Sequence, residues 1–321
     1  MNSNRSAVWA LAGVAVGFGL PVLALIGIVV AVGFSATRLA GDAVPAASRY
    51  TQVSGPEDGP AVAVLDVVGP IASGSSSPFE TRPVTASGDL VPLIRRAARN
   101  PDVTALMLRL NSPGGSVVGS DEIYHALRET QKPVVAFLQE VAASGAYYVG
   151  MAAEHIVANP NSLTGSIGVI GQFPNAEALM EKIGVQVTTI KSGESKDLGN
   201  PFRAMSDDEQ AIFQDIVDET YGRFVDIVSR GRNLPTEQVR ELADGRIYTG
   251  QKALELGLVD ALGYQQDALD VAARLGNIDG EPRVLHYRRR GGFLDLIGGA
   301  VSPQRWLRRL MAPSLQYRWE P

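Results

Sequence analysis

Apolar residues are arranged in two different ways along this chain of 321 residues. Residues 7–36 form a continuous stretch that has no charged side chain and is rich in Ala, Val, Leu, Ile and Gly. A helix of this length, at about 1.5 Å rise per residue, exceeds the ~30 Å hydrocarbon core of a bilayer. Because a cleavable signal sequence has a shorter apolar core of roughly 7–15 residues, the pattern predicts a retained transmembrane helix. The charges that flank the stretch leave its orientation open.

From residue 60 onwards, short apolar runs alternate with segments whose apolar residues recur at helical spacing. The runs predict strands at 61–68, 103–110, 134–138, 154–158, 166–170 and 185–190. The other segments predict helices at 90–98, 122–127, 176–183 and 206–232, with further helices up to residue 275. Such alternation predicts an α/β domain in which helices flank parallel sheets.

Composition divides the chain into four parts. Residues 1–36 comprise a short stub, expected in the cytoplasm, and the predicted membrane helix. Residues 37–59, rich in Ala, Pro, Ser and Gly, indicate a linker. Residues 60–280 hold the α/β domain, and residues 281–321 form a tail that mixes arginines with large apolar side chains. Such a tail either lies on an anionic membrane surface or remains solvated, and the sequence leaves both possibilities open.

Charge and composition restrict the chemistry. The formal net charge is −5, and the part of the chain outside the basic tail carries a larger negative charge. This balance argues against nucleic acid as a partner. The absence of cysteine excludes disulfides, thiolate metal sites and a cysteine nucleophile. The three histidines, His125, His155 and His286, fall in a predicted helix, a predicted strand and the tail, where we expect structural roles. No side-chain cluster suggests a metal or cofactor.

Two segments suit acyl transfer. Ser144 follows a predicted strand and precedes the small, apolar run 145–153, which places its hydroxyl at the start of a helix. Gly114 and Gly115 follow another strand, and one of their N–H groups, with that of Gly145, can form an oxyanion hole. Taken alone, the serine can be explained as an ordinary helix cap, and the glycines can be explained as an ordinary Pro-Gly-Gly turn.

A third segment offers a base for the serine. A serine hydroxyl is a weak nucleophile that needs a general base, and none of the three histidines is well placed for this role. Lys196 follows a predicted strand and can serve if its surroundings keep the amine neutral. Ser166 is a candidate hydrogen-bond partner for that amine.

These segments together resemble the signal peptide peptidase A family of membrane-anchored serine proteases, which use a Ser–Lys dyad. The resemblance covers about residues 61–275. It rests on Asn-Ser-Pro-Gly-Gly at 111–115, Ala-Ala-Ser-Gly-Ala-Tyr-Tyr at 142–148, Thr-Gly-Ser-Ile-Gly at 164–168 and Gly-Glu-Ser-Lys at 193–196. The chain departs from the family pattern at Ala146, usually glycine, and at Ser195, usually tyrosine, but neither position supplies the hydroxyl or amine of the dyad.

The resemblance implies a Clp/crotonase-like domain with Ser144 as nucleophile, Lys196 as general base and Ser166 as support for the lysine amine. It also implies ring-like homo-oligomers whose neighbouring chains complete each active site, and an extracytoplasmic catalytic domain on the cell membrane. The implied substrates are signal peptide remnants and other unfolded, membrane-derived segments. Neither a cofactor nor a metal is implied.

Three other interpretations remain open. A Clp-type protease shares the glycine loop and the serine turn but needs a histidine, and residues 163–170 contain none. A crotonase-type enzyme acting on acyl-coenzyme A needs two glutamates, whereas Glu140 is the one acidic residue near these loops. A catalytically inactive, membrane-tethered scaffold would not need the intact dyad.

Overall fold

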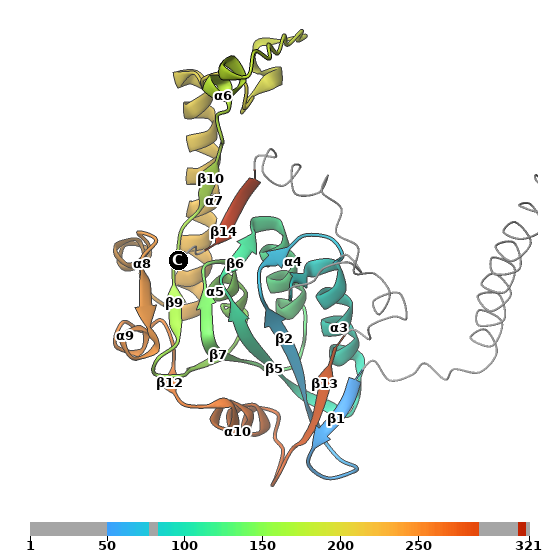
Figure 1. Cartoon of the computed structure of the whole chain (residues 1–321). Coiled ribbons are helices and arrows are strands. Elements are labelled where there is room, and N and C mark those ends of the chain that lie inside the picture. Colours follow the sequence, from blue (N-terminus) through green and yellow to red (C-terminus); the bar gives the residue numbers. More distant parts are fainter. Residues whose placement is uncertain (1–49, 77–82, 289–313, 319–321) are drawn as a thin grey trace, which may run out of the picture. The chain divides into compact units, whose positions relative to one another are not determined.

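The computed structural model describes residues 50–76, 83–288 and 314–318 (Figure 1). The predicted membrane helix, most of the predicted linker and most of the basic tail lie outside these residues. Among the described residues, no helix has the length and apolar character needed to cross a bilayer.

A sheet with parallel central strands forms the centre of the domain. Its strands are β1 (Tyr50–Ser54), β2 (Ala61–Val68), β5 (Val103–Ser112), β7 (Val134–Ala143), β8 (His155–Ala158), β9 (Leu163–Gly165), β11 (Ile247–Thr249), β12 (Ala261–Leu262) and β13 (Arg283–Tyr287). They run in the order β1-β13-β2-β5-β7-β8-β12, with β9 beside β7 and β11 beside β9. The path from β13 to β12 is parallel throughout, whereas β1 and β11 pair antiparallel with their neighbours.

Helices cover both faces of this sheet. They are α3 (Ser87–Arg99), α4 (Val117–Arg128) and α5 (Gly145–Gly150) on one face and α10 (Gln265–Leu275) on the other. Along β5, Leu106, Leu108 and Leu110 pack toward the first face, while Ala105 and Met107 pack toward α10. Burial on both sides explains why the strand is an almost continuous apolar run. The predicted α/β class is confirmed, and the arrangement fits a Clp/crotonase-like domain.

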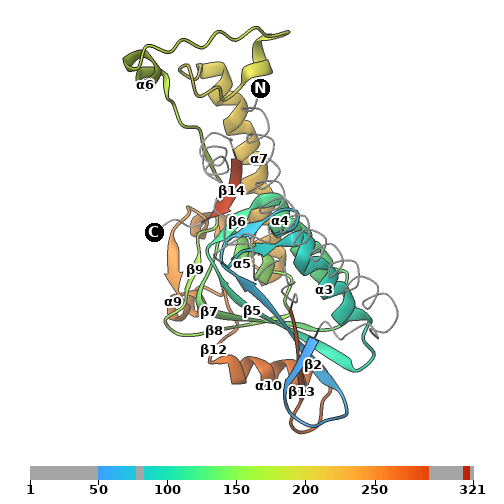
Figure 2. The same ribbon diagram turned by 45° about the vertical axis from the view of Figure 1, so that its right-hand side comes forward.

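Residues 170–223 form an arm that stands clear of the sheet (Figures 1 and 2). The arm contains β10 (Ile170–Gln172), α6 (Glu177–Lys182), the 3-10 helix η2 (Glu194–Asp197) and the first part of α7 (Asp207–Arg232). Ser206 and Glu209 form the capping box that begins α7, as the sequence predicts. Near the other end of α7, Phe224 is fully buried and packs edge-on against Tyr148. The C-terminal part of α7 therefore anchors the arm in the core.

A second, smaller sheet lies beside the first part of the arm. It consists of β3 (Ile71–Ala72), β4 (Thr85–Ala86), β6 (Gly114–Ser116), β10 and β14 (Ser314–Arg318), in the order β10-β14-β6-β3-β4. β14 comes from the C-terminal region and pairs antiparallel with both β10 and β6. The last described segment of the chain is thus a central strand of this sheet.

Two predicted strands are wrong. Residues 166–170 are not one strand, because Gly165 and Ser166 both have positive φ, at 80° and 49°, and interrupt the chain between β9 and β10. Residues 185–190 form no strand. Their apolar side chains are exposed, Ile190 to 96%, so the described residues provide no surface that covers the predicted strand.

The predicted boundary between domain and tail, after residue 280, precedes the last strand of the central sheet. β13 lies between β1 and β2, so the sheet extends beyond residue 280. His286 is part of β13 and not of a solvated tail. Its Nε2 lies 2.7 Å from Asp66 on β2, and Arg109 on β5 donates two hydrogen bonds to the same carboxylate. These three groups link neighbouring strands and are partly exposed.

The Asp66 cluster predicts an acid-sensitive contribution to stability. Burial raises the pKa of Asp66, but hydrogen bonds from His286 and Arg109 outweigh this effect and lower it from 3.8 to about 2. The contribution is therefore present above about pH 4 and is lost as the pH falls toward 2. In urea unfolding, Asp66→Asn should destabilise the protein by about 1–2 kcal/mol at pH 6, a value reduced for partial exposure.

The difference between wild type and Asp66→Asn should shrink toward zero near pH 2. Asp215→Asn, at an exposed position on α7, serves as the control and should follow wild type across the pH range. A destabilisation by Asp66→Asn that is the same at pH 2 and pH 6 would contradict the linkage.

Candidate active site

Ser144 occupies a strained turn between β7 and α5. Its backbone has φ 55° and ψ −120°, a conformation that side-chain-bearing residues rarely adopt. The turn is held by two hydrogen bonds: the Ser144 N–H donates to the Gly165 carbonyl at 2.8 Å, and the Ser144 carbonyl accepts from Tyr148 N–H at 2.9 Å. The surrounding structure thus holds this serine in one orientation at the end of the strand.

Small residues and two tyrosines explain how this turn is accommodated. Ala142, Ala143 and Ala146 are completely buried, so α5 packs closely against the sheet. Tyr147 is also completely buried, and its hydroxyl donates to the Leu258 carbonyl at 2.7 Å. The Tyr148 hydroxyl donates to the Asp121 carboxylate at 2.6 Å. Ala146, one of the departures from the family pattern, lies in this packed region.

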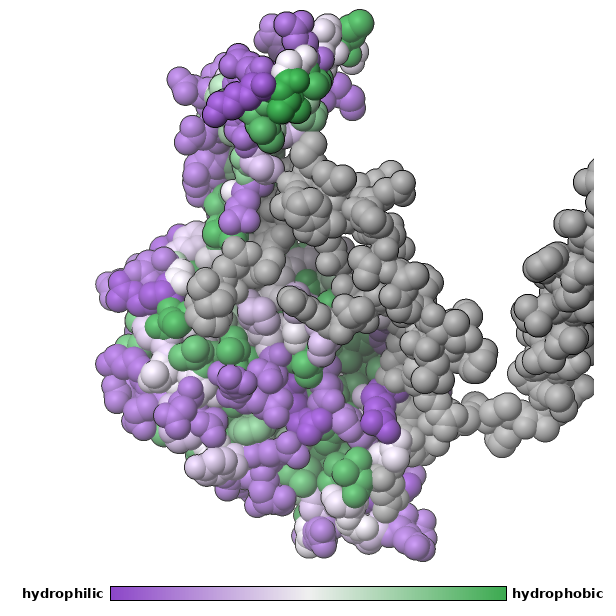
Figure 3. All heavy atoms as spheres, in the orientation of Figure 1, coloured by the Kyte–Doolittle hydropathy of each residue, from purple (hydrophilic) through white to green (hydrophobic). Residues whose placement is uncertain are grey.

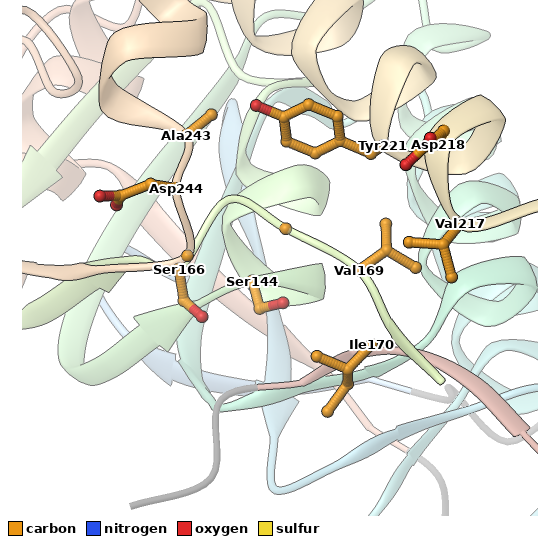
Figure 4. A pocket seen from close by; sticks show the side chains of 11 residues that line it. Ser144, Ser166, Val169, Ile170, Val217, Asp218, Tyr221, Ala243 and Asp244 are labelled. Atoms are coloured by element: carbon orange, nitrogen blue, oxygen red, sulfur yellow. The ribbon is translucent and has the colours of Figure 1, made fainter. Parts of the chain in front are cut away.

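Ser166 directly follows β9, whose last residue, Gly165, pairs with Ala143 on β7. Its N–H donates to the Arg246 carbonyl at 2.8 Å, and Gly165 pairs with Ile247 across β9 and β11. A side chain on Gly165 would meet the Tyr248 ring at 2.6 Å, so this close approach requires glycine. Figure 4 shows the hydroxyls of Ser144 and Ser166 at one cavity. The structure therefore brings these two predicted residues together.

The cavity, of about 440 Å³, has a largely apolar wall supplied by four parts of the chain. Besides the two serines it is lined by Gly168, Val169, Ile170, Val217, Asp218, Tyr221, Ala243, Asp244 and Gly245. The α7 residues in this wall were not predicted from the sequence. Val217 and Tyr221 are four residues apart, and this spacing predicts that they share one face of a helix. The sequence around them does not show which part of the protein that face contacts.

Asp244 is not available as a base for Ser144. Its carboxylate points away from Ser144 (Figure 4) and accepts hydrogen bonds from Arg246. These bonds lower the pKa of Asp244 to about 2, so the group is ionised and already paired at neutral pH. Within the described part of the chain, no group of three or more His, Asp or Glu side chains is arranged to hold a metal ion.

The glycine loop has the expected unusual backbone. Gly114 and Gly115 have φ of 91° and 151°, and a side chain on Gly115 would collide with the Ile71 carbonyl at 2.1 Å. β6, which contains both glycines, contacts α5. The Gly114 N–H donates to the Ser112 hydroxyl at 3.1 Å, so it must leave that partner before it can hold an oxyanion. The assignment of Gly114, Gly115 and Gly145 as oxyanion donors stays a prediction.

Lys196 does not line the cavity. It is exposed on η2, and the adjacent Asp197 is bound by Arg203, which also pairs with Glu209 near the start of α7. Glu209 and Val217, which is in the cavity wall, are eight positions apart on α7, about 12 Å along the helix axis. One chain therefore brings Ser144 and Ser166 together but leaves Lys196 at the other end of the arm.

An ion-pair network shapes the tip of the arm around Lys196. Arg203 donates to both oxygens of Glu209, at 2.7 and 2.6 Å, and to Asp197. Lys191 pairs with Asp197 at 2.7 Å. Hydrogen bonds from Arg203 and Lys191 hold the pKa of Asp197 well below its usual range. The network keeps η2 in place although the residues before it have little cover from the described part of the chain. Of these features, only the capping box was predicted from the sequence.

Comparison with known proteins gives consistent matches. Residues 126–279 match the family described as peptidase family S49. The chain is 44% identical over 220 residues to a putative protease of Synechocystis sp., covering 68% of this chain and 75% of that protein. It is 40% identical to a putative protease of Methanocaldococcus jannaschii, over 59% and 61% of the two chains. It is 39% identical to a putative signal peptide peptidase SppA of Enterococcus faecium, over 65% and 62%.

The strained turn predicts that glycine is more stable than alanine at position 144. Glycine adopts positive φ without a steric penalty, whereas alanine retains the strain. Ser144→Gly should therefore be more stable than Ser144→Ala by about 1 kcal/mol, after the higher chain entropy of glycine is included. Urea unfolding of the two variants measures the difference. If alanine is equally stable or more stable, the turn is not strained in solution.

Proposed function

The chain belongs to peptidase family S49 and is therefore a serine peptidase, and we propose that it pairs Ser144 of one chain with Lys196 of a second copy. The proposal is carried by one observation: Ser144 and Ser166 face a formed cavity, while Lys196 is exposed elsewhere on the same chain. A lysine acts as a general base only when its amine is uncharged, which requires removal from water. An exposed lysine gains that environment when another surface covers it.

The arm supplies a surface that a second copy can cover. Leu179, Ile183, Val185, Val187 and Ile190 are exposed by 44–96%, and Figure 3 shows hydrophobic side chains on the tip of the arm. Apolar side chains grouped in this way mark interaction sites. A head-to-tail contact that repeats around an axis closes into a ring, so we propose a ring-like homo-oligomer in which each arm reaches the cavity of its neighbour.

The proposed reaction is acyl transfer. Neutral Lys196 takes the proton of the Ser144 hydroxyl as Oγ attacks the peptide carbonyl, and backbone N–H groups of Gly145 and the glycine loop stabilise the oxyanion. The protonated lysine then gives its proton to the leaving amine. Water, activated by the same lysine, hydrolyses the acyl-enzyme and releases the serine. Ser166, at the cavity beside Ser144, would hold the lysine amine in position.

The substrates that we propose are signal peptide remnants and other unfolded segments near a membrane. One relative is called a signal peptide peptidase, and the mostly apolar cavity wall suits apolar side chains. Residues 7–36 would anchor the chain, with the catalytic domain outside the cytoplasm and the basic tail near anionic lipid. The S49 match does not favour the acyl-coenzyme A enzyme or the inactive scaffold considered above.

Loss of either member of the dyad should abolish peptidase activity. We expect Ser144→Ala and Lys196→Met to reduce hydrolysis of an unfolded protein by at least about 10³-fold, since the nucleophile and its base act as one unit. Lys182→Met, another exposed lysine on the arm, is the matched control and should retain activity. A fluorophosphonate probe should label wild type at Ser144. Hydrolysis that persists in Lys196→Met would remove this lysine from the mechanism.

Mixing inactive variants tests whether the site is shared. Co-assembly of Ser144→Ala with Lys196→Met should restore about a quarter of wild-type activity, because random mixing places an intact serine beside an intact lysine at one heterologous interface in about four. Each variant assembled alone should stay inactive. Mixed assemblies that form, as shown by two different affinity tags, and yet show no activity would contradict the sharing of sites between chains.

A further inference from the structure

One carboxylate in the wall of the Ser144 cavity has no role in the proposed reaction. Asp218 lines the cavity from α7, as do Val217 and Tyr221 on the same helix. In the view of Figure 4, Asp218 lies on the opposite side of the cavity from Asp244. The two acidic side chains of the lining therefore come from different walls.

Asp218 lacks the cation that neutralises Asp244. Arg246 donates to both carboxylate oxygens of Asp244. Asp218 instead accepts a 2.7 Å hydrogen bond from the side-chain amide of Gln214, one turn earlier on α7. A neutral amide donates a hydrogen bond but supplies no compensating charge. The two carboxylates therefore differ in what they can offer to a substrate.

Basic side chains close to this wall have other contacts. Arg223, further along α7, pairs with Glu219, and Arg240 lies over the Tyr221 ring, 5.8 Å from its centroid. Within the described part of the chain, no lysine, arginine or histidine forms an ion pair with Asp218. The cavity wall thus presents one carboxylate that a cation from outside can reach.

A lysine or arginine side chain of a substrate matches these surroundings. Such a side chain combines an apolar stem with a charged end. The stem can lie along the apolar wall, which includes Val169, Val217 and Tyr221, and the end can pair with Asp218. Asp218 is exposed in a single chain, and a bound side chain that covers it strengthens the charged hydrogen bond. An apolar side chain at this point would remove water from the carboxylate without supplying a partner.

We propose that Asp218 is a specificity-determining residue that favours substrates carrying lysine or arginine beside an apolar run. The proposal rests on the proposed peptidase function and narrows its substrate class. A secretory signal peptide has a positively charged segment next to its apolar core, so the junction between them offers both features. The apolar residues of such a segment contact the wall of the cavity, and its cation binds Asp218.

Matched peptides test this preference. Two peptides of one apolar sequence differ at a single position, which holds either lysine or the uncharged norleucine and is moved in turn along both sides of the cleaved bond. At the position that reaches Asp218, wild type should prefer lysine, and Asp218→Asn should lower the lysine-to-norleucine ratio of kcat/KM by about tenfold. Asp218→Glu keeps the charge and should retain most of the preference. Asp215→Asn, exposed on the same helix but absent from the cavity lining, is the control and should leave the ratio unchanged.

A ratio that Asp218→Asn leaves unchanged at every position would overturn the proposal. This outcome includes an equal loss of activity toward both peptides, which would mean that Asp218 acts on Lys196 and not on the substrate.

A binding measurement separates this proposal from the peptidase mechanism. Fluorescent forms of the same peptides are titrated with the Ser144→Ala chain and with the chain that carries both Ser144→Ala and Asp218→Asn. The first chain should bind the best lysine peptide about tenfold more tightly than its norleucine counterpart, and the second chain should lose this difference. Added salt should reduce the difference as well. This readout needs no catalysis, so inactivity of wild type would refute the peptidase mechanism alone. Equal affinities of the first chain for the lysine and norleucine peptides would refute the role of Asp218.

Discussion

The left-handed backbone of Ser144 is the constraint on which the rest of the site depends. Such a conformation costs about 1–3 kcal/mol in a residue with a side chain, and it persists because the structure on all sides determines it. Complete burial of the neighbouring alanines, the Tyr147 hydrogen bond to Leu258 and the Gly165 carbonyl all oppose relaxation of the turn. The hydroxyl therefore faces the cavity wherever the core is intact.

The proposed base, Lys196, is held in place differently from the proposed nucleophile, Ser144. Ser144 is positioned by the close-packed core, whereas Lys196 belongs to an arm whose tip is held by ion pairs between partly exposed basic side chains and largely buried carboxylates. In a single chain, Lys196 is exposed to solvent and does not line the cavity of Ser144. In the proposed assembly, the environment that makes it a base would form only when chains associate, which would couple catalysis to assembly.

The small sheet connects these two parts of the molecule. β6 carries the glycine loop, β10 leads from the Ser166 turn into the arm, and β14 joins them. An extended segment in this position completes two ladders at once, so the site would select for unfolded backbone.

Local patterns along the sequence determined the α/β class, the central strands, the capping box of α7 and the serine turn with its glycines, because periodicity, small residues and turn residues act over a few positions. Sequence alone did not predict that His286 binds Asp66, that α7 supplies a wall of the cavity, or that residues 314–318 complete a sheet. It also placed a strand at 185–190 that one chain does not form. Each of these features depends on which surface meets a segment, and only tertiary contacts between residues far apart in the chain decide that.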